Sequence, residues 1–185
     1  MQGAIALVGG TVAATQLGSL VSDVSAMDSD YSPQFLGPNQ FSMVEQIVDL
    51  IIPETDTPGA KTAGVHRFID MMLAEWASPQ TKANYVEGLQ AIDARSQMAD
   101  GKSFVESSPE IQLKILKALD AEAFAENGSN TFFRELKKFV LFGYYSSEEG
   151  ASVELRYDRL PGAYRGCVPM EDIGRSWSAI SYLGA

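Results

Sequence analysis

The sequence has very few of the residues that build metal and thiol sites. Its 185 residues include one cysteine, Cys167, and one histidine, His66. A single cysteine excludes an intramolecular disulfide, a cysteine-based zinc site and the two-cysteine attachment of a c-type haem. A single histidine excludes a metal site that needs two histidines. The sequence therefore lacks most self-contained catalytic machinery of these kinds.

Basic residues are also scarce. There are 14 Lys and Arg residues against 24 Asp and Glu, which gives a net charge of −10 and a pI of about 4.5. Phosphate backbones repel such a chain unless it carries a local basic patch. The densest basic spots are Lys137-Lys138 and Arg156 with Arg159, and neither is a patch of that kind. We therefore expect no nucleic-acid partner.

Residues 1–26 form an apolar N-terminal segment. Residues 3–21 carry no charge and are long enough to span a membrane, but glycine and threonine dilute their hydrophobicity. Val24-Ser25-Ala26 fits the small residues that precede a signal cleavage site. The weak hydrophobicity suits a twin-arginine export signal, although the chain opens without the basic start of one. We interpret the segment as a residual signal of this type, or as an apolar helix buried against another surface.

The remainder of the chain is predicted to be all-α. Residues 27–40 read as a linker and residues 41–185 as one domain of five or six helices that ends in an irregular C-terminal tail. Apolar stripes of helical spacing cover residues 41–51 and 65–76, and Pro53 stops the first of them. Ser-Pro pairs start helices at residues 79 and 109, and the latter is apolar over more than half its circumference. Such a helix is expected to be central, or covered by a partner.

Two features could carry stand-alone chemistry. His66 and Asp70 stand four residues apart on one predicted helix, a spacing that can orient an imidazole as a general base. Cys167 could act as a nucleophile with Arg165 nearby to lower its pKa. We favour plainer interpretations, in which His66 lies partly exposed at the edge of its stripe and Cys167 is a small buried hydrophobic residue.

The stretch from residue 131 to about residue 146 holds six aromatic side chains within fourteen residues. Their helical spacing indicates core packing. Six rings are nevertheless more than one side of a helix can bury inside a small domain. We therefore predict that part of this surface, at Phe142, Tyr144 and Tyr145, meets a partner.

Several segments have distinctive sequences. Residues 48–60 read VDLIIPETDTPGA and are followed by AGV at 63–65 and FID at 68–70. Residues 143–148 read GYYSSE, residues 155–157 read LRY, and residues 162–167 read GAYRGC. Together these segments resemble the gluconate 2-dehydrogenase subunit 3 family, which has a similar GYYTSE stretch and a similar C-terminal signature. The likeness extends from about Phe41 to Trp177.

The resemblance implies an accessory subunit without catalytic, cofactor-binding or metal-binding residues of its own. In such complexes the catalytic partner is a large FAD protein of the glucose–methanol–choline type, and a multihaem cytochrome c often receives the electrons. The small subunit is expected to help the flavoprotein fold and leave the cytoplasm on its twin-arginine signal. This implies a periplasmic chain with indirect membrane association. The Arg-Arg pair of that signal is absent here.

Contact residues are therefore the predicted functional residues. The proline-rich segment is expected to form a rigid turn between two helices, and the tyrosines and arginines are typical interface anchors. Two alternatives remain open: a cofactor-free enzyme that uses His66 and Asp70, and a scaffold anchored in the membrane by residues 3–21. The predicted contact residues are Pro53, Thr55, Thr57, Pro58, Gly59, Tyr144, Tyr145, Arg156, Tyr157, Tyr164 and Arg165.

Overall fold

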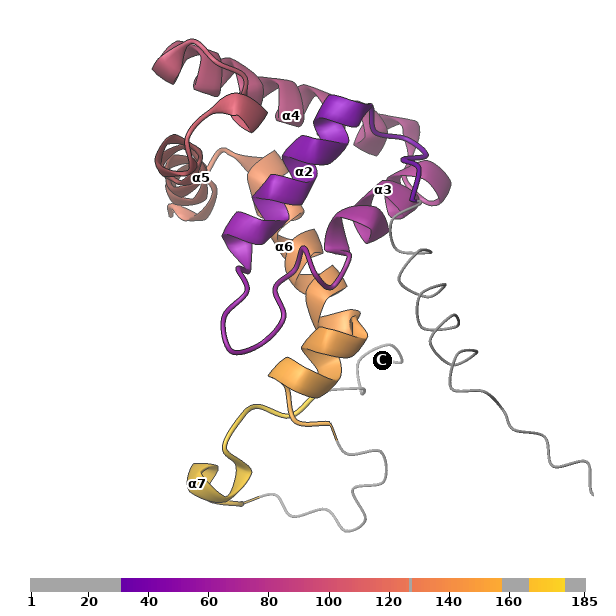
Figure 1. The fold of residues 1–185 in the computed structure, drawn as a ribbon, viewed down its shortest axis with the longest axis vertical. Helices are drawn as coiled ribbons and strands as arrows, with labels where there is room; N and C mark the ends of the chain where they lie inside the picture. The colour runs from indigo at the N-terminus through magenta and orange to yellow at the C-terminus, as the bar shows by residue number, and fades with distance from the viewer. Residues whose placement is uncertain (1–30, 127, 158–166, 179–185) are drawn as a thin grey trace, which may run out of the picture. The chain divides into compact units, whose positions relative to one another are not determined.

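The computed structural model describes residues 31–126, 128–157 and 167–178 (Figure 1). These ranges contain six α-helices and no strand, which confirms the all-α prediction. None of the described helices is both long and apolar enough to cross a membrane. The helices are α2 (Pro38–Ile51), α3 (Val65–Glu75), α4 (Pro79–Asp100), α5 (Pro109–Phe124), α6 (Thr131–Ser146) and α7 (Met170–Ile173), with a 3₁₀ turn η1 (Phe104–Glu106) and a π-helix η2 (Glu149–Glu154).

The helix boundaries follow the local signals in the sequence. Ser78 accepts a hydrogen bond from Thr81 N at 3.1 Å and starts α4, and Asn130 accepts one from Phe133 N at 3.0 Å and starts α6. Proline occupies the first turn of α2, α4 and α5, where its missing N–H costs nothing. Gly101 ends α4 with a φ of 75°, a left-handed conformation that glycine adopts without strain.

The first described helix begins earlier than the sequence indicated. Gly37 is its N-cap and Pro38 its first residue, so the last three residues of the predicted linker, 38–40, are helical. The side chain of Gln40 accepts a hydrogen bond from Gly37 N at 3.2 Å. This local hydrogen bond caps the N-terminus of α2 in a segment whose apolar residues show no helical spacing. The predicted segment 1–26 lies outside the described residues.

Helix α6 is the central helix of the bundle. It packs against α2, α3, α4 and α5, and it leads into η2 (Figure 1). Phe133, Leu136, Val140 and Tyr144 on one face of α6 are fully or almost fully buried. The helix that starts at residue 109 was expected to be central or covered by a partner, and the first alternative is wrong: α5 packs mainly on α4 and α6, and Leu113 is exposed. Cover by a partner stays a prediction.

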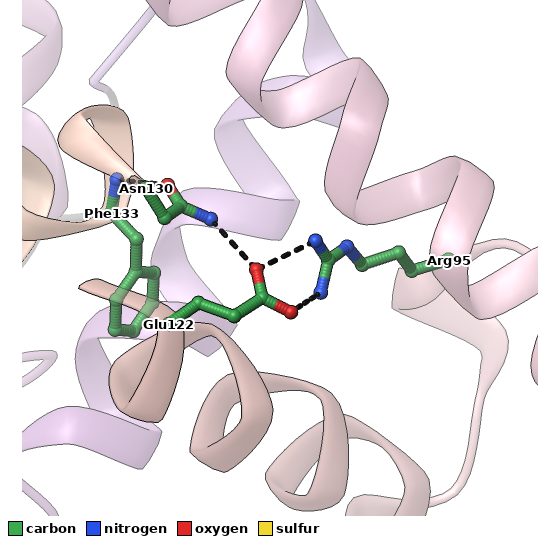
Figure 2. Close-up of polar contacts among 4 residues, drawn as sticks. All are labelled: Arg95, Glu122, Asn130 and Phe133. Atoms are coloured by element: carbon green, nitrogen blue, oxygen red, sulfur yellow. Dashed lines mark hydrogen bonds and ion pairs between the residues drawn. The ribbon is translucent and has the colours of Figure 1, made fainter. Parts of the chain in front are cut away.

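A polar network links α4, α5 and the N-terminal end of α6 (Figure 2). Arg95 of α4 donates two parallel hydrogen bonds to Glu122 of α5, at 2.7 and 2.8 Å. Asn130, at the start of α6, donates to the same carboxylate at 3.5 Å. These shared hydrogen bonds raise the pKa of Arg95 and lower the pKa of Glu122. The network adds directional contacts between α4, α5 and α6, whose apolar contacts are not directional.

Candidate partner interface

The loop between α2 and α3 is a tightly built turn with an exposed tip. Pro53 follows the last turn of α2, and Ala60 N donates to Ile52 O at 2.9 Å to close the loop. A Cβ at Gly59 would lie 2.6 Å from Glu54 N and 2.9 Å from Ile52 O. Because these neighbours are backbone atoms that cannot move aside, only glycine fits this position. The predicted turn between the two helices is present, and Pro53 and Thr55 are on its exposed face. Its rigidity stays a prediction.

Two hydrogen bonds fasten this loop to the end of α6 and to η2. The Tyr144 hydroxyl donates to Pro58 O at 2.7 Å, and the Thr57 hydroxyl donates to Glu154 Oε2 at 2.6 Å. The two bonds join segments 86 and 97 residues apart in the sequence. The structure therefore brings together the two most distinctive motifs, residues 48–60 and 143–148.

The two tyrosines of the second motif have different roles. The Tyr144 side chain is 1% exposed, so the structure places it in the core and not at the surface expected for a contact residue. Burial raises the pKa of Tyr144 and outweighs a hydrogen bond with Thr57 that lowers it. Tyr145 stands 5.2 Å away, ring centroid to ring centroid, and remains exposed. Phe142 is 50% exposed. The aromatic helix thus presents Phe142 and Tyr145 to solvent.

The π-helix η2 starts against the backbone of α6. A Cβ at Gly150 would lie 2.0 Å from Tyr144 O, so the close approach requires glycine. Glu154, at the end of η2, is a functional candidate that the sequence analysis missed. Its bond to Thr57 depends on tertiary contact, and no spacing in the sequence indicates it. Single π-turns of this kind often occur at functional sites.

Beyond η2 the chain forms what we call the arm, the described residues 155–157 and 167–178. Its base is closed by Arg156 N donating to Ser176 O and Ser178 N donating to Arg156 O, both at 2.8 Å. The Arg156 guanidinium lies over the Trp177 ring, 4.5 Å from its centroid. Tyr157 is exposed beside this pair. Tyr164 and Arg165 lie outside the described residues, so their predicted contacts stay predictions.

An apolar groove lies where α3, α4 and α6 meet. Its volume is about 410 Å³, and its walls include Met72, Trp76, Tyr85, Phe139 and Phe142. Trp76 is 74% exposed at the C-terminal end of α3. Glu135 and Lys138 line the groove as well, and Glu135 adds to the effect of burial that raises the pKa of Tyr85.

The structure gives His66 and Asp70 an architectural role. Asp70 is completely buried, and its carboxylate accepts hydrogen bonds from the backbone N–H groups of Gln34, Phe35 and Leu36, at 2.6, 3.2 and 2.7 Å. These bonds hold the chain that leads into α2 against α3. His66 is 4% exposed and packs edge-on against Phe41, with ring centroids 5.2 Å apart. The prediction that His66 is partly exposed is therefore wrong. Because both side chains are buried, no substrate can reach His66 or Asp70 in this arrangement.

The prediction for Cys167 is also wrong, because its thiol is exposed rather than buried. Its neighbours whose side chains the structure describes, residues 168, 169, 171 and 172, are exposed as well, so they offer no core to a small side chain. Among the described residues, no group of three or more His, Cys, Asp or Glu side chains is arranged to hold a metal ion.

Comparison with known proteins supports the resemblance noted in the sequence. Residues 38–162 of the 185 match the family model described as gluconate 2-dehydrogenase subunit 3. The match begins at Pro38, the first residue of α2, and covers α2–α6, both motifs and η2. It ends at residue 162, a few residues after the start of the arm. A search of curated proteins and a search of solved structures found no match. Since the family match covers more than half of the chain, this protein belongs to the gluconate 2-dehydrogenase subunit 3 family.

Proposed function

We propose that this chain is the non-catalytic small subunit of a FAD-dependent dehydrogenase of sugars or polyols. In this role it stabilises the large flavoprotein subunit and assists its folding and export. The family match over residues 38–162 carries the proposal, since a family of subunits implies partner subunits. The large subunit would bind FAD and perform the oxidation, and a cytochrome c subunit would receive the electrons.

The distribution of exposed apolar side chains supports a role in an assembly. Trp76 and Phe142 in the groove, Tyr145 at the end of α6, and Tyr157 and Trp177 on the arm are all exposed. Aromatic side chains of this size are enriched where proteins meet. The groove, the end of α6 and the arm therefore offer contact surfaces to a partner subunit.

We further propose that the complex works in the periplasm and reaches the membrane through its other subunits. Residues 1–26 would then be what remains of the export signal, in keeping with the uncharged, glycine-containing stretch at residues 3–21. Cell fractionation tests this directly. The chain should appear in the periplasmic or peripheral membrane fraction, and detection only in the cytoplasm would exclude the proposal.

The decisive experiment is purification of the tagged chain from its native host under mild conditions, followed by a visible spectrum. We expect a large co-purifying protein with flavin bands that a sugar or polyol bleaches. The substrate would be identified by trial, because it is set by the large subunit. A colourless chain that elutes alone would exclude the role of dehydrogenase subunit.

Expression of the large subunit with and without this chain tests the folding role separately. We expect the flavin-loaded, soluble yield of the large subunit to fall severalfold when the chain is left out. An unchanged yield would exclude the stabilising role and leave the subunit role standing.

A further inference from the structure

The base of the arm presents an ordered tryptophan–arginine pair to solvent. Trp177 is 44% exposed, although its ring is stacked by Arg156 and its two neighbours, Ser176 and Ser178, are each hydrogen-bonded to the backbone of Arg156. Arg156 also donates to Asp172 O at 3.3 Å. Tryptophan and arginine are the residues most enriched among those that carry binding energy at interfaces. Side chains that are already ordered lose less entropy on binding, so this pair is preorganised for a contact.

Two further apolar side chains close to the pair in the sequence are exposed. Val153 at the end of η2 is 42% exposed and Tyr157 is 46% exposed. Neither belongs to the hydrophobic core of the bundle, nor does Trp177. We call Val153, Arg156, Tyr157 and Trp177 the docking patch. Single exposed apolar residues are normal on protein surfaces, but an exposed tryptophan stacked by an arginine is the kind of side chain that anchors interfaces.

The segments around the docking patch are strongly acidic. Arg156 and Arg175 are the described basic residues on these segments, and both already donate to backbone carbonyl groups, Arg156 to Asp172 O and Arg175 to Val153 O. Elsewhere, Lys61, Arg95 and Lys137 pair with carboxylates. Among the described residues of these segments, acids therefore outnumber bases. The acids, which we call the rim of the docking patch, are Glu148, Glu149, Glu154, Glu171 and Asp172.

We infer that the docking patch is the main contact of this chain with the large dehydrogenase subunit. The partner surface that fits it has an apolar pocket for Trp177 and a rim of lysine and arginine side chains. The pocket would supply most of the affinity, and the oppositely charged rims would steer and orient the encounter. The inference rests on the proposed function, because it assigns the place of contact within that complex.

Hydroxyl-radical footprinting of the purified complex tests the assignment residue by residue. The chain has two tryptophans, so Trp76 in the groove is an internal control for Trp177 on the arm. We expect oxidation of Trp177 and Tyr157 to fall at least about fivefold relative to Trp76 when the complex is compared with the separated chain. Equal oxidation of Trp177 in both samples would overturn the inference.

Substitutions give a second, independent readout. Trp177→Ala should weaken the complex at least about tenfold, as expected for a central interface residue, while Trp76→Ala should change it less than about threefold. Circular dichroism of each variant shows whether the bundle is intact. Weakening by Trp76→Ala but not by Trp177→Ala would place the interface in the groove and overturn the inference.

The charge of the rim is tested by salt and by charge reversal. Association should slow severalfold between 50 and 500 mM salt, by the ordinary screening of opposite charges. Glu148→Lys with Asp172→Lys should abolish that dependence, while Glu87→Lys on the exposed face of α4 should leave it unchanged. If the association rate of the double variant still depends on salt, the inference that the acidic rim steers the encounter would be overturned. Failure to isolate any complex would instead overturn the proposed function.

Discussion

The bundle and the arm use opposite means to become ordered. In the bundle, α2–α6 bury large side chains such as Phe104, Phe133 and Tyr144 almost completely. In the arm, the described side chains are exposed or half-exposed, and order comes from two backbone hydrogen bonds, the hydrogen bonds that Arg156 and Arg175 donate to backbone carbonyls, and one cation–π stack. A fold that buries apolar area is stable by itself, whereas a segment held by exposed polar contacts gains little free energy from them. The bundle is thus suited to act as a scaffold, and the arm to bind a partner.

Among polar side chains, the largest loss of bundle stability is expected on substitution of Asp70. We expect Asp70→Ala to lower the free energy of unfolding by about 3 kcal/mol, because backbone N–H groups of residues 34–36 lose their acceptor. Urea unfolding followed by circular dichroism measures the loss. Glu87→Ala, at an exposed position of α4, is the control and should change stability by less than about 0.5 kcal/mol. Equal stability of the two variants would show that the Asp70 contacts do not support the bundle.

The next largest effect is expected at the loop between α2 and α3. Gly59→Ala places a Cβ against backbone atoms at 2.6–2.9 Å and should cost about 2 kcal/mol. Gly37→Ala is its matched control, because the nearest atom to that Cβ is Gln40 Oε1 at 3.7 Å. We expect thermal unfolding to separate the two variants by several degrees. If they unfold together, the loop is not rigid.

High pH should destabilise the bundle and spare the arm. Burial, with Glu135 adding to it, raises the pKa of Tyr85 well above the ordinary value of 10.0. The folded state therefore holds this proton more tightly than the unfolded state, so its contribution to stability is complete below pH 10 and is lost as the pH rises. At pH 11 we expect a loss of about 1.4 kcal/mol from this group. Tyr85→Phe should reduce the loss, and an equal pH profile for the variant would refute the assignment.

Neighbouring tyrosines at the end of α6 should differ in a measurable way. Tyr144→Phe removes the hydrogen bond to Pro58 O and should cost about 1 kcal/mol. Tyr145→Phe, one residue further on and exposed, should leave the unfolding free energy within about 0.5 kcal/mol of the original. Urea titrations of the pair provide the comparison, and a reversed order would contradict the roles assigned here.

The smallest effect on stability is expected in the arm. Trp177→Ala should change the free energy of unfolding of the bundle by less than about 0.5 kcal/mol, because Trp177 lies outside the hydrophobic core. Phe133→Ala, in the core of α6, should cost about 3–5 kcal/mol. A large loss on removing Trp177 would mean that the arm is part of the folding unit, and the contrast between the two regions would disappear.

Much of the fold could be predicted because its signals are local. Ser78-Pro79 and Ser108-Pro109 start helices, Gly101 ends one, and apolar periodicity marks their buried faces. The predicted start of α2 is three residues too late. The hydrogen bond between Gln40 and Gly37 N at the start of this helix has no counterpart in the spacing of the apolar residues. The importance of the motifs at residues 48–60 and 143–148 was also visible in the sequence.

The helical composition, the turn at Pro53–Gly59 and the lack of paired cysteine or histidine ligands follow from the sequence alone. Which side chains face inward depends on how the helices pack in three dimensions. The tertiary structure placed Tyr144 in the core and Tyr145 outside, exposed Cys167, and gave Asp70 three backbone donors from residues 34–36. The physical reason is that periodicity describes one helix at a time. Burial and the Thr57–Glu154 and Arg156–Trp177 contacts depend on segments that only the folded chain brings together.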